Sequence, residues 1–124
     1  MIKKWVVSGA VFAFLSIAIG AFGAHGLRDV LNEYGKSIYQ TAVLYQIFHS
    51  LALIALAIIQ NQWQIPRLNI SGWSFIAGIL IFSGSLYIIA ITGFRTLGAV
   101  TPVGGLAFLF GWFWFILQII KYEK

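Results

Sequence analysis

Cysteine is absent from the 124-residue sequence, which excludes disulfides, thiol chemistry and iron–sulfur clusters. Charge is scarce as well: Asp, Glu, Lys and Arg together make up 9% of the residues, against about 25% in a typical soluble domain. Hydrophobic residues make up 60%, and the mean hydropathy is +0.92. This composition excludes an ordinary soluble domain and predicts an integral membrane protein.

The few charges are spread along the chain outside the apolar stretches. A net charge of +5 without a clustered basic face is typical of membrane-flank anchoring and argues against nucleic-acid binding. No Asp or Glu lies inside an apolar stretch. Small multidrug transporters depend on a membrane-embedded carboxylate, so this absence counts against proton-coupled cation export.

Four apolar stretches are long enough to cross a bilayer, which needs about 20 helical residues. We therefore expect an all-α, four-helix membrane bundle that forms a single domain over residues 1–124. The expected spans are residues 5–24, 38–60, 71–93 and 101–120. The first span is too long for a signal peptide, whose apolar region has about 7–15 residues, so we expect it to be retained.

The expected helix ends follow from local signals. Ser37 and Gln40 form a capping box that would open the second span. Ser71 is a candidate N-cap for the third span, Gly93 a stop for it, and Thr101-Pro102 a start for the fourth. Between the first two spans, apolar residues recur at helical spacing over residues 27–34. That pattern predicts a short amphipathic helix lying in the membrane interface and ending at Gly35.

Lys and Arg near the span ends predict the orientation. Five of them lie on the side of the termini and three on the other side, at Arg28, Lys36 and Arg95. The positive-inside rule then places both termini in the cytoplasm.

His49 lies near the middle of the second span, with Tyr45 and Gln46 on adjoining parts of the same helical face. A titratable group at that depth is a candidate functional residue. Counting along the other spans places further polar or small residues at similar depth: Ser16, Ser83, Ser85 and Gly111. One interpretation is structural, with a neutral His49 hydrogen-bonded to Ser85 or Tyr87. The other is a proton relay or a ligand contact.

His25, Arg28 and Arg95 fall on the side opposite the termini. His25 is either a head-group, quinone or proton contact, or a helix-end residue near the last carbonyls. The two arginines either hold a phosphate or carboxylate or simply extend to the interface. We expect no cofactor: the two histidines lie at different depths, which disfavours a shared haem, and no Cys or nearby carboxylate completes a metal site.

Small residues recur at three- or four-residue spacing in the first and last spans and predict close helix packing. The packing glycines are expected at Gly20, Gly23, Gly84, Gly104 and Gly111. The many aromatic residues of the last span are explained by packing and lipid contact, with a quinone or acyl-chain groove between helices as the alternative.

Four motifs, spread over all four spans, resemble a known family: GAFGAH (20–25), YQIFHSLA (45–52), FSGSLY (82–87) and VTPVGG (100–105), followed by Phe108 and Gly111-Trp112. The chain is similar to the YgdD/YwdK-like proteins, small bacterial inner-membrane proteins of unknown function. The resemblance implies four transmembrane helices and a bacterial plasma membrane. It directs attention to the following positions: Gly20, Gly23, His25, Gly26, Tyr45, His49, Ser83, Gly84, Ser85, Tyr87, Pro102, Gly104 and Gly105.

We expect a non-enzymatic accessory, assembly or lipid- or quinone-binding protein, whose partners are membrane lipids and either a larger membrane complex or further copies of itself. The alternative is a small oligomeric transporter or channel with His49 as a proton-sensitive group. An enzyme using Ser85 with His49 would need water at the bilayer centre and a third group to orient the imidazole.

Overall fold

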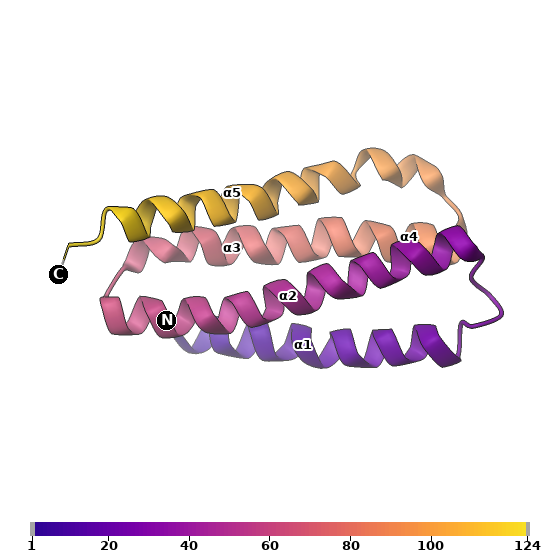
Figure 1. Cartoon of the computed structure of the whole chain (residues 1–124), viewed down its shortest axis with the longest axis horizontal. Helices are drawn as coiled ribbons and strands as arrows, with labels where there is room; N and C mark the ends of the chain where they lie inside the picture. The colour runs from indigo at the N-terminus through magenta and orange to yellow at the C-terminus, as the bar shows by residue number, and fades with distance from the viewer. Residues whose placement is uncertain (1, 124) are drawn as a thin grey trace.

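The computed structural model describes residues 2–123 and shows an all-α chain, with no strand in that range. Met1 and Lys124, which belong to the expected basic ends, lie outside the described residues. Within the described range, four helical segments are long and apolar enough to cross a membrane: Lys3–His25, Glu33–Trp63, Pro66–Thr92 and Arg95–Ile120. They run antiparallel along the long axis, and both termini lie at the same end (Figure 1).

The first two helices form the tightest pair. Helix α1 (Ile2–His25) packs along α2 (Glu33–Trp63). A Cβ atom at Gly9 would stand 2.6 Å from the backbone oxygen of Ser50, and one at Gly23 would overlap the ring of Tyr39. Gly20 lies against Val43 with ordinary spacing. Glycine on α1 therefore allows the close approach that the sequence predicts for this helix.

The interfacial amphipathic helix expected at residues 27–34 is not supported. Residues 26–30 form turns, Leu31 lies in a bend, and α2 already begins at Glu33. The backbone N–H of Gly35 donates to the Asn32 side chain at 2.7 Å, so Asn32 is the N-cap of α2 and the capping box expected at Ser37 lies inside the helix. Leu27 and Leu31 are buried, as their spacing predicts, but the turns between α1 and α2 bury them without forming a helix.

The third segment is one long helix of changing pitch. A short 3-10 turn, η1 (Pro66–Leu68), leads into α3 (Asn69–Gly78), a π-helical segment η2 (Ile79–Ser83) and α4 (Gly84–Thr92). Ser71 is not its N-cap; it is buried within α3. Gly93 ends the segment in the left-handed conformation, with φ of 75°, and confirms the expected stop.

The main helix of the last segment has the bounds expected for the fourth span, but its N-cap is Val100 and not Thr101. A 3-10 helix, η3 (Arg95–Ala99), precedes α5 (Thr101–Ile120), whose N-cap is Val100 while Pro102 lies in the first turn. Helix α5 packs on α3 and η2, and α4 with η2 packs on α2. The third segment therefore lies between α2 and α5, with α1 and α5 as the outer helices of Figure 1.

Phenylalanine rings and glycines interlock α5 with the third segment. A Cβ atom at Gly104 would stand 2.7 Å from the Cα atom of Phe82, and one at Gly111 would stand 2.7 Å from the Phe75 ring. Gly78 receives the Phe108 ring in the same way. Gly84 is different, because a Cβ atom there would meet nothing within 4 Å. The expectation that Gly84 is a packing glycine is wrong, since it faces away from the neighbouring helices.

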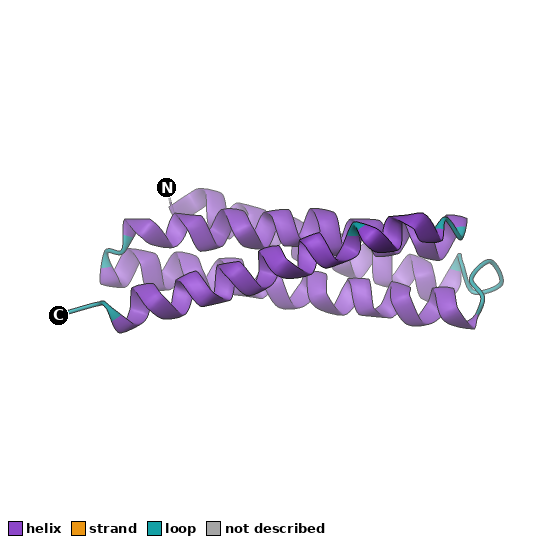
Figure 2. Ribbon diagram, turned by 90° about the horizontal axis from the view of Figure 1, so that it is seen from above, coloured by secondary structure: helices purple, strands orange, loops and turns teal. Residues whose placement is uncertain are grey.

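The main core lies along these contacts. It contains Trp5, Leu53, Leu56, Ala57, Ile65, Leu68, Phe75, Ile79 and Phe108. Seen from above, the helices form a narrow bundle joined by short loops at its two ends (Figure 2).

Candidate functional site

His49 on α2 is 3% exposed, and both ring nitrogens are hydrogen-bonded inside the protein. Its Nδ1 lies 2.8 Å from the backbone oxygen of Tyr45, and its Nε2 accepts from the indole N–H of Trp112 at 3.0 Å. A carbonyl only accepts and an indole N–H only donates. His49 is therefore the neutral tautomer with its proton on Nδ1.

Aromatic rings enclose this histidine. The imidazole stacks on Phe108 with centroids 3.7 Å apart and planes 13° apart, and it meets Phe48 and Phe75 edge-on. The hydrogen bonds predicted from His49 to Ser85 or Tyr87 are wrong. Sequence position gives the depth of a residue on a helix, but Trp112 becomes the partner because α5 brings it to that depth from 63 residues away.

A groove of about 800 Å³ lies between α2 and α5 beside His49. Its lining is apolar apart from Tyr45, His49 and Trp112, and it consists of Leu44, Tyr45, Phe48, His49, Phe82, Pro102, Gly105, Leu106, Phe108, Leu109 and Trp112. This volume falls within the range of about 300–1,000 Å³ typical of small-molecule sites. The groove is open along the side of the helices and is not an enclosed cavity.

Tyr45 supplies the free polar group of this groove. Its side chain is 41% exposed, and its ring leans on Phe82 with centroids 4.8 Å apart. Its hydroxyl has no hydrogen-bond partner among the residues that the structure describes. Tyr45 therefore contributes one available O–H in an otherwise apolar wall, whereas the polar atoms of His49 and Trp112 are already paired.

Gln46 belongs to a different cluster, on the side of α2 that faces α1 and α4. Its amide Nε2 donates to the Phe12 backbone oxygen at 3.0 Å, and its Oε1 accepts from the Tyr87 hydroxyl at 2.6 Å. One side chain thus joins three helices. The Tyr39 hydroxyl donates to the Ile19 oxygen at 2.5 Å and adds a second hydrogen bond between α2 and α1.

The predicted serines each bond a neighbouring backbone or side chain rather than His49. Ser83 Oγ donates to the Ala42 oxygen on α2 at 2.8 Å. Ser85 Oγ lies 2.6 Å from Thr101 Oγ1 and links α4 to the start of α5. Ser16 Oγ returns to its own helix at Phe12. The polar residues expected at one depth therefore form several separate contacts and not one relay.

The residues expected at the end opposite the termini are not brought together. His25 is the exposed last residue of α1. The guanidinium of Arg95 lies over the Tyr34 ring at 4.3 Å, a cation–π contact. Arg28 lines a separate groove between α1 and α2. No group of three or more His, Cys, Asp or Glu in the described part of the chain could hold a metal ion.

The sequence interpretation missed two features. One is Trp112 as the hydrogen-bond partner of His49. The available signal was the place of Trp112, with its indole N–H, in the Gly111-Trp112 pair that belongs to the family resemblance. The other is a buried polar cluster near the termini, where Gln60 Nε2 and the Trp5 indole both donate to Asn69 Oδ1, at 2.9 and 2.8 Å. Gln60 also donates to the Pro66 oxygen at 3.1 Å and so fixes the α2–α3 connection.

Comparison with known proteins decides the family. The family model described as "Protein of unknown function (DUF423)" matches residues 19–105. The chain belongs to this family. A UPF0382 membrane protein of Staphylococcus haemolyticus is 42% identical over 120 residues, covering 97% of this chain and 98% of that protein. The UPF0382 membrane protein YwdK of Bacillus subtilis is 38% identical over 121 residues, with the same coverage.

The family resemblance read from the motifs is thereby confirmed. The relatives are named as membrane proteins, which agrees with the four apolar helices, so this is a multi-pass membrane protein. The family is one of unknown function. No solved structure matches the chain.

Proposed function

We propose that this protein is a non-enzymatic protein of the bacterial plasma membrane that binds one lipidic molecule, a quinone or an acyl lipid, in the groove between α2 and α5. The observation that carries the proposal is the groove itself. It is about 800 Å³ in volume, almost entirely apolar, open to lipid, and has the free Tyr45 hydroxyl on its wall. A ligand with one carbonyl and an apolar tail matches that lining.

The bonding of His49 supports a structural role beside the groove. Both nitrogens are engaged, and the ring is held between Phe108 and the edges of Phe48 and Phe75. Protonating Nε2 would break the bond from Trp112, because an indole N–H cannot be accepted by a protonated nitrogen. In this proposal His49 fixes the floor of the groove by tying α2 to α5.

The orientation belongs to the same proposal. Both termini lie at one end of the molecule (Figure 1). That end has more Lys and Arg than the other in the sequence, so the positive-inside rule supports cytoplasmic termini. In this proposal the protein is an accessory or assembly component of a larger membrane complex.

Native mass spectrometry on protein extracted gently in its own lipids tests the proposal. Leu106 lines the groove and is 65% exposed, so Leu106→Trp fills the groove without entering the core. Leu80 on η2 is 61% exposed and lies outside the groove, which makes Leu80→Trp the matched control.

We expect a reproducible quinone or lipid to co-purify with the unaltered protein and with Leu80→Trp, and to be lost in Leu106→Trp. Tyr45→Phe should weaken its retention while leaving the fold intact. A homo-oligomer with nothing bound would overturn the proposal and favour the small transporter or channel, to be followed by flux assays on His49 variants.

A further inference from the structure

A separate groove, of about 600 Å³, lies between α1 and α2 close to the turns that join them. Its apolar walls include Gly20 and Ala24 on α1 and Val43 and Ile47 on α2. The Tyr39 ring also lines it, with the hydroxyl already bonded to the Ile19 oxygen. Below the basic end, the one polar side chain of the lining besides Tyr39 is Gln40, which is exposed on α2 one turn after Lys36.

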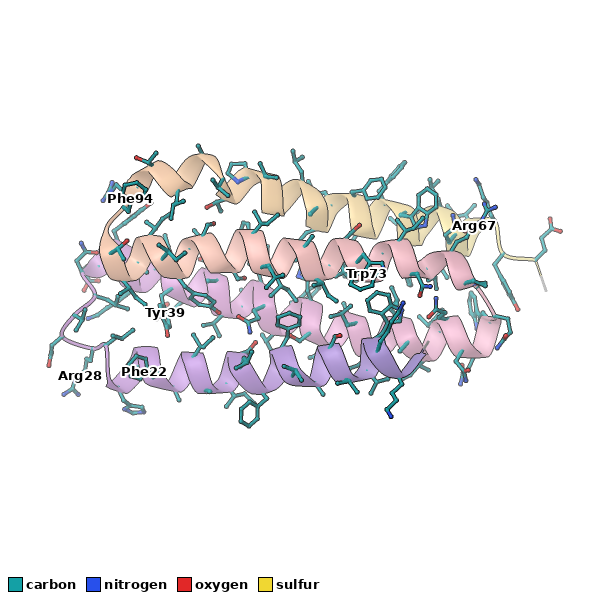
Figure 3. The ribbon with its side chains drawn as sticks, turned by 180° about the vertical axis from the view of Figure 1, so that it is seen from behind. Phe22, Arg28, Tyr39, Arg67, Trp73 and Phe94 are labelled. Atoms are coloured by element: carbon teal, nitrogen blue, oxygen red, sulfur yellow. The ribbon has the colours of Figure 1, made fainter. Side chains whose placement is uncertain are left out.

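Two basic side chains stand at the mouth of this groove. Arg28 comes from the turns after α1 and Lys36 from the first turn of α2. Neither has a hydrogen-bond or ion-pair partner among residues 2–123. Asp29 and Glu33 are exposed at the same end but do not line the groove. Figure 3 shows Arg28 beyond the end of α1, on the loop, with Tyr39 between the two helices.

The depth of the groove matches one leaflet. From Lys36 to Ile47 the helix rises through 11 residues, or about 16 Å at 1.5 Å per residue. Half of a hydrocarbon core about 30 Å thick is about 15 Å. A basic mouth above a mostly apolar wall of that length matches a phospholipid in charge and dimensions. The phosphate and the polar part of the headgroup would lie at Arg28, Lys36 and Gln40, and an acyl chain would lie along the rest of the wall.

We propose that this groove binds one anionic phospholipid, with the headgroup phosphate between Arg28 and Lys36 and one acyl chain lying along the α1–α2 seam. The site is in the leaflet opposite the termini. Small residues on α1 leave room for the chain, and the paired basic groups select negative charge. This site is separate from the α2–α5 groove, although Leu44 lines both, and Leu44 is therefore left unchanged in every variant.

The test compares lipid retention after reconstitution into vesicles of equal phosphatidylglycerol and phosphatidylcholine. Protein is released into detergent, and native mass spectrometry counts each lipid that stays bound. The variant is Arg28→Gln/Lys36→Gln. The matched control is Lys3→Gln/Arg95→Gln, which removes the same charge from exposed residues outside the groove.

Each basic residue near a membrane surface changes affinity for anionic lipid about fivefold, so the double variant should lose about 25-fold in phosphatidylglycerol retention. The control variant should retain phosphatidylglycerol to within about twofold of the unaltered protein. Equal losses in the two variants would show a simple response to net charge and would overturn the proposal, as would equal retention of the two lipids by the unaltered protein.

A second variant tests the acyl part without changing charge. Ala24 is exposed within the groove, so Ala24→Phe fills it without entering the core. We expect it to reduce phosphatidylglycerol retention while thermal unfolding and helical content stay unchanged. Full retention in a folded Ala24→Phe protein would contradict an acyl chain in this seam.

Discussion

Replacing Gly104 by alanine tests the contact between α5 and the π-helical segment. The added Cβ atom would stand 2.7 Å from both the Cα and the Cβ atoms of Phe82. Ordinary contacts need about 3.5–4.0 Å, so the two helices must separate by about an ångström or more. The obstacle is backbone, which has no rotamer to move aside, and overpacking of this kind costs about 1–3 kcal/mol.

Gly84→Ala is the matched control, because Gly84 lies two residues after Phe82 but faces away from the neighbouring helices, and its added Cβ atom meets nothing within 4 Å. Its effect should be between zero and about 1 kcal/mol of stabilisation, from helix propensity alone. Unfolding of both variants by SDS in mixed micelles measures the difference. We expect Gly104→Ala to be the less stable by about 1–3 kcal/mol, and equal stabilities would refute the close packing of α5 on Phe82.

Three further substitutions test single hydrogen bonds. Trp112→Phe removes the donor to His49 Nε2 and should cost about 1 kcal/mol of unfolding free energy. In ¹⁵N NMR spectra Nδ1 should be protonated in both proteins, and Nε2 should lose its hydrogen bond only in the variant. A proton on Nε2 in the unaltered protein would contradict the tautomer assignment. Tyr87→Phe leaves Gln46 Oε1 without its donor and should cost a similar amount in the SDS assay, whereas no change would show that water replaces the phenol. Asn32→Ala should cost about 1 kcal/mol and speed amide exchange at the start of α2, and exchange rates unchanged there would place the cap elsewhere.

Hydropathy was sufficient to predict four apolar membrane helices and an all-α chain, because the bilayer requires backbone hydrogen bonds to be satisfied within each span. The start of α2 was not predictable in the same way. Asn32 and Ser37 are both good N-caps followed by helix-forming residues. Which of the two residues caps the helix depends on Gly35, which lies close to the Ala90 oxygen of α4. This contact packs the first turn of α2 against α4.

The partner of His49 could not be predicted for a related reason. The sequence gives the depth of each residue but not the rotation of one helix about another. Phe108 and Trp112 reach His49 because α5 is set against Phe75, Gly78 and Phe82 of the third segment. The π-helical turn in that segment also depends on packing rather than on a local signal.

A photo-crosslinking experiment tests the central claim most directly. The photoreactive residue benzoylphenylalanine is placed at position 106 in the groove between α2 and α5, and in a second protein at position 80, an exposed position outside that groove. Irradiation in native membranes is followed by mass analysis of the adducts. The account predicts one dominant quinone or lipid adduct at position 106 and a mixture resembling bulk lipid at position 80. The same bulk mixture at both positions would contradict a specific ligand in the groove.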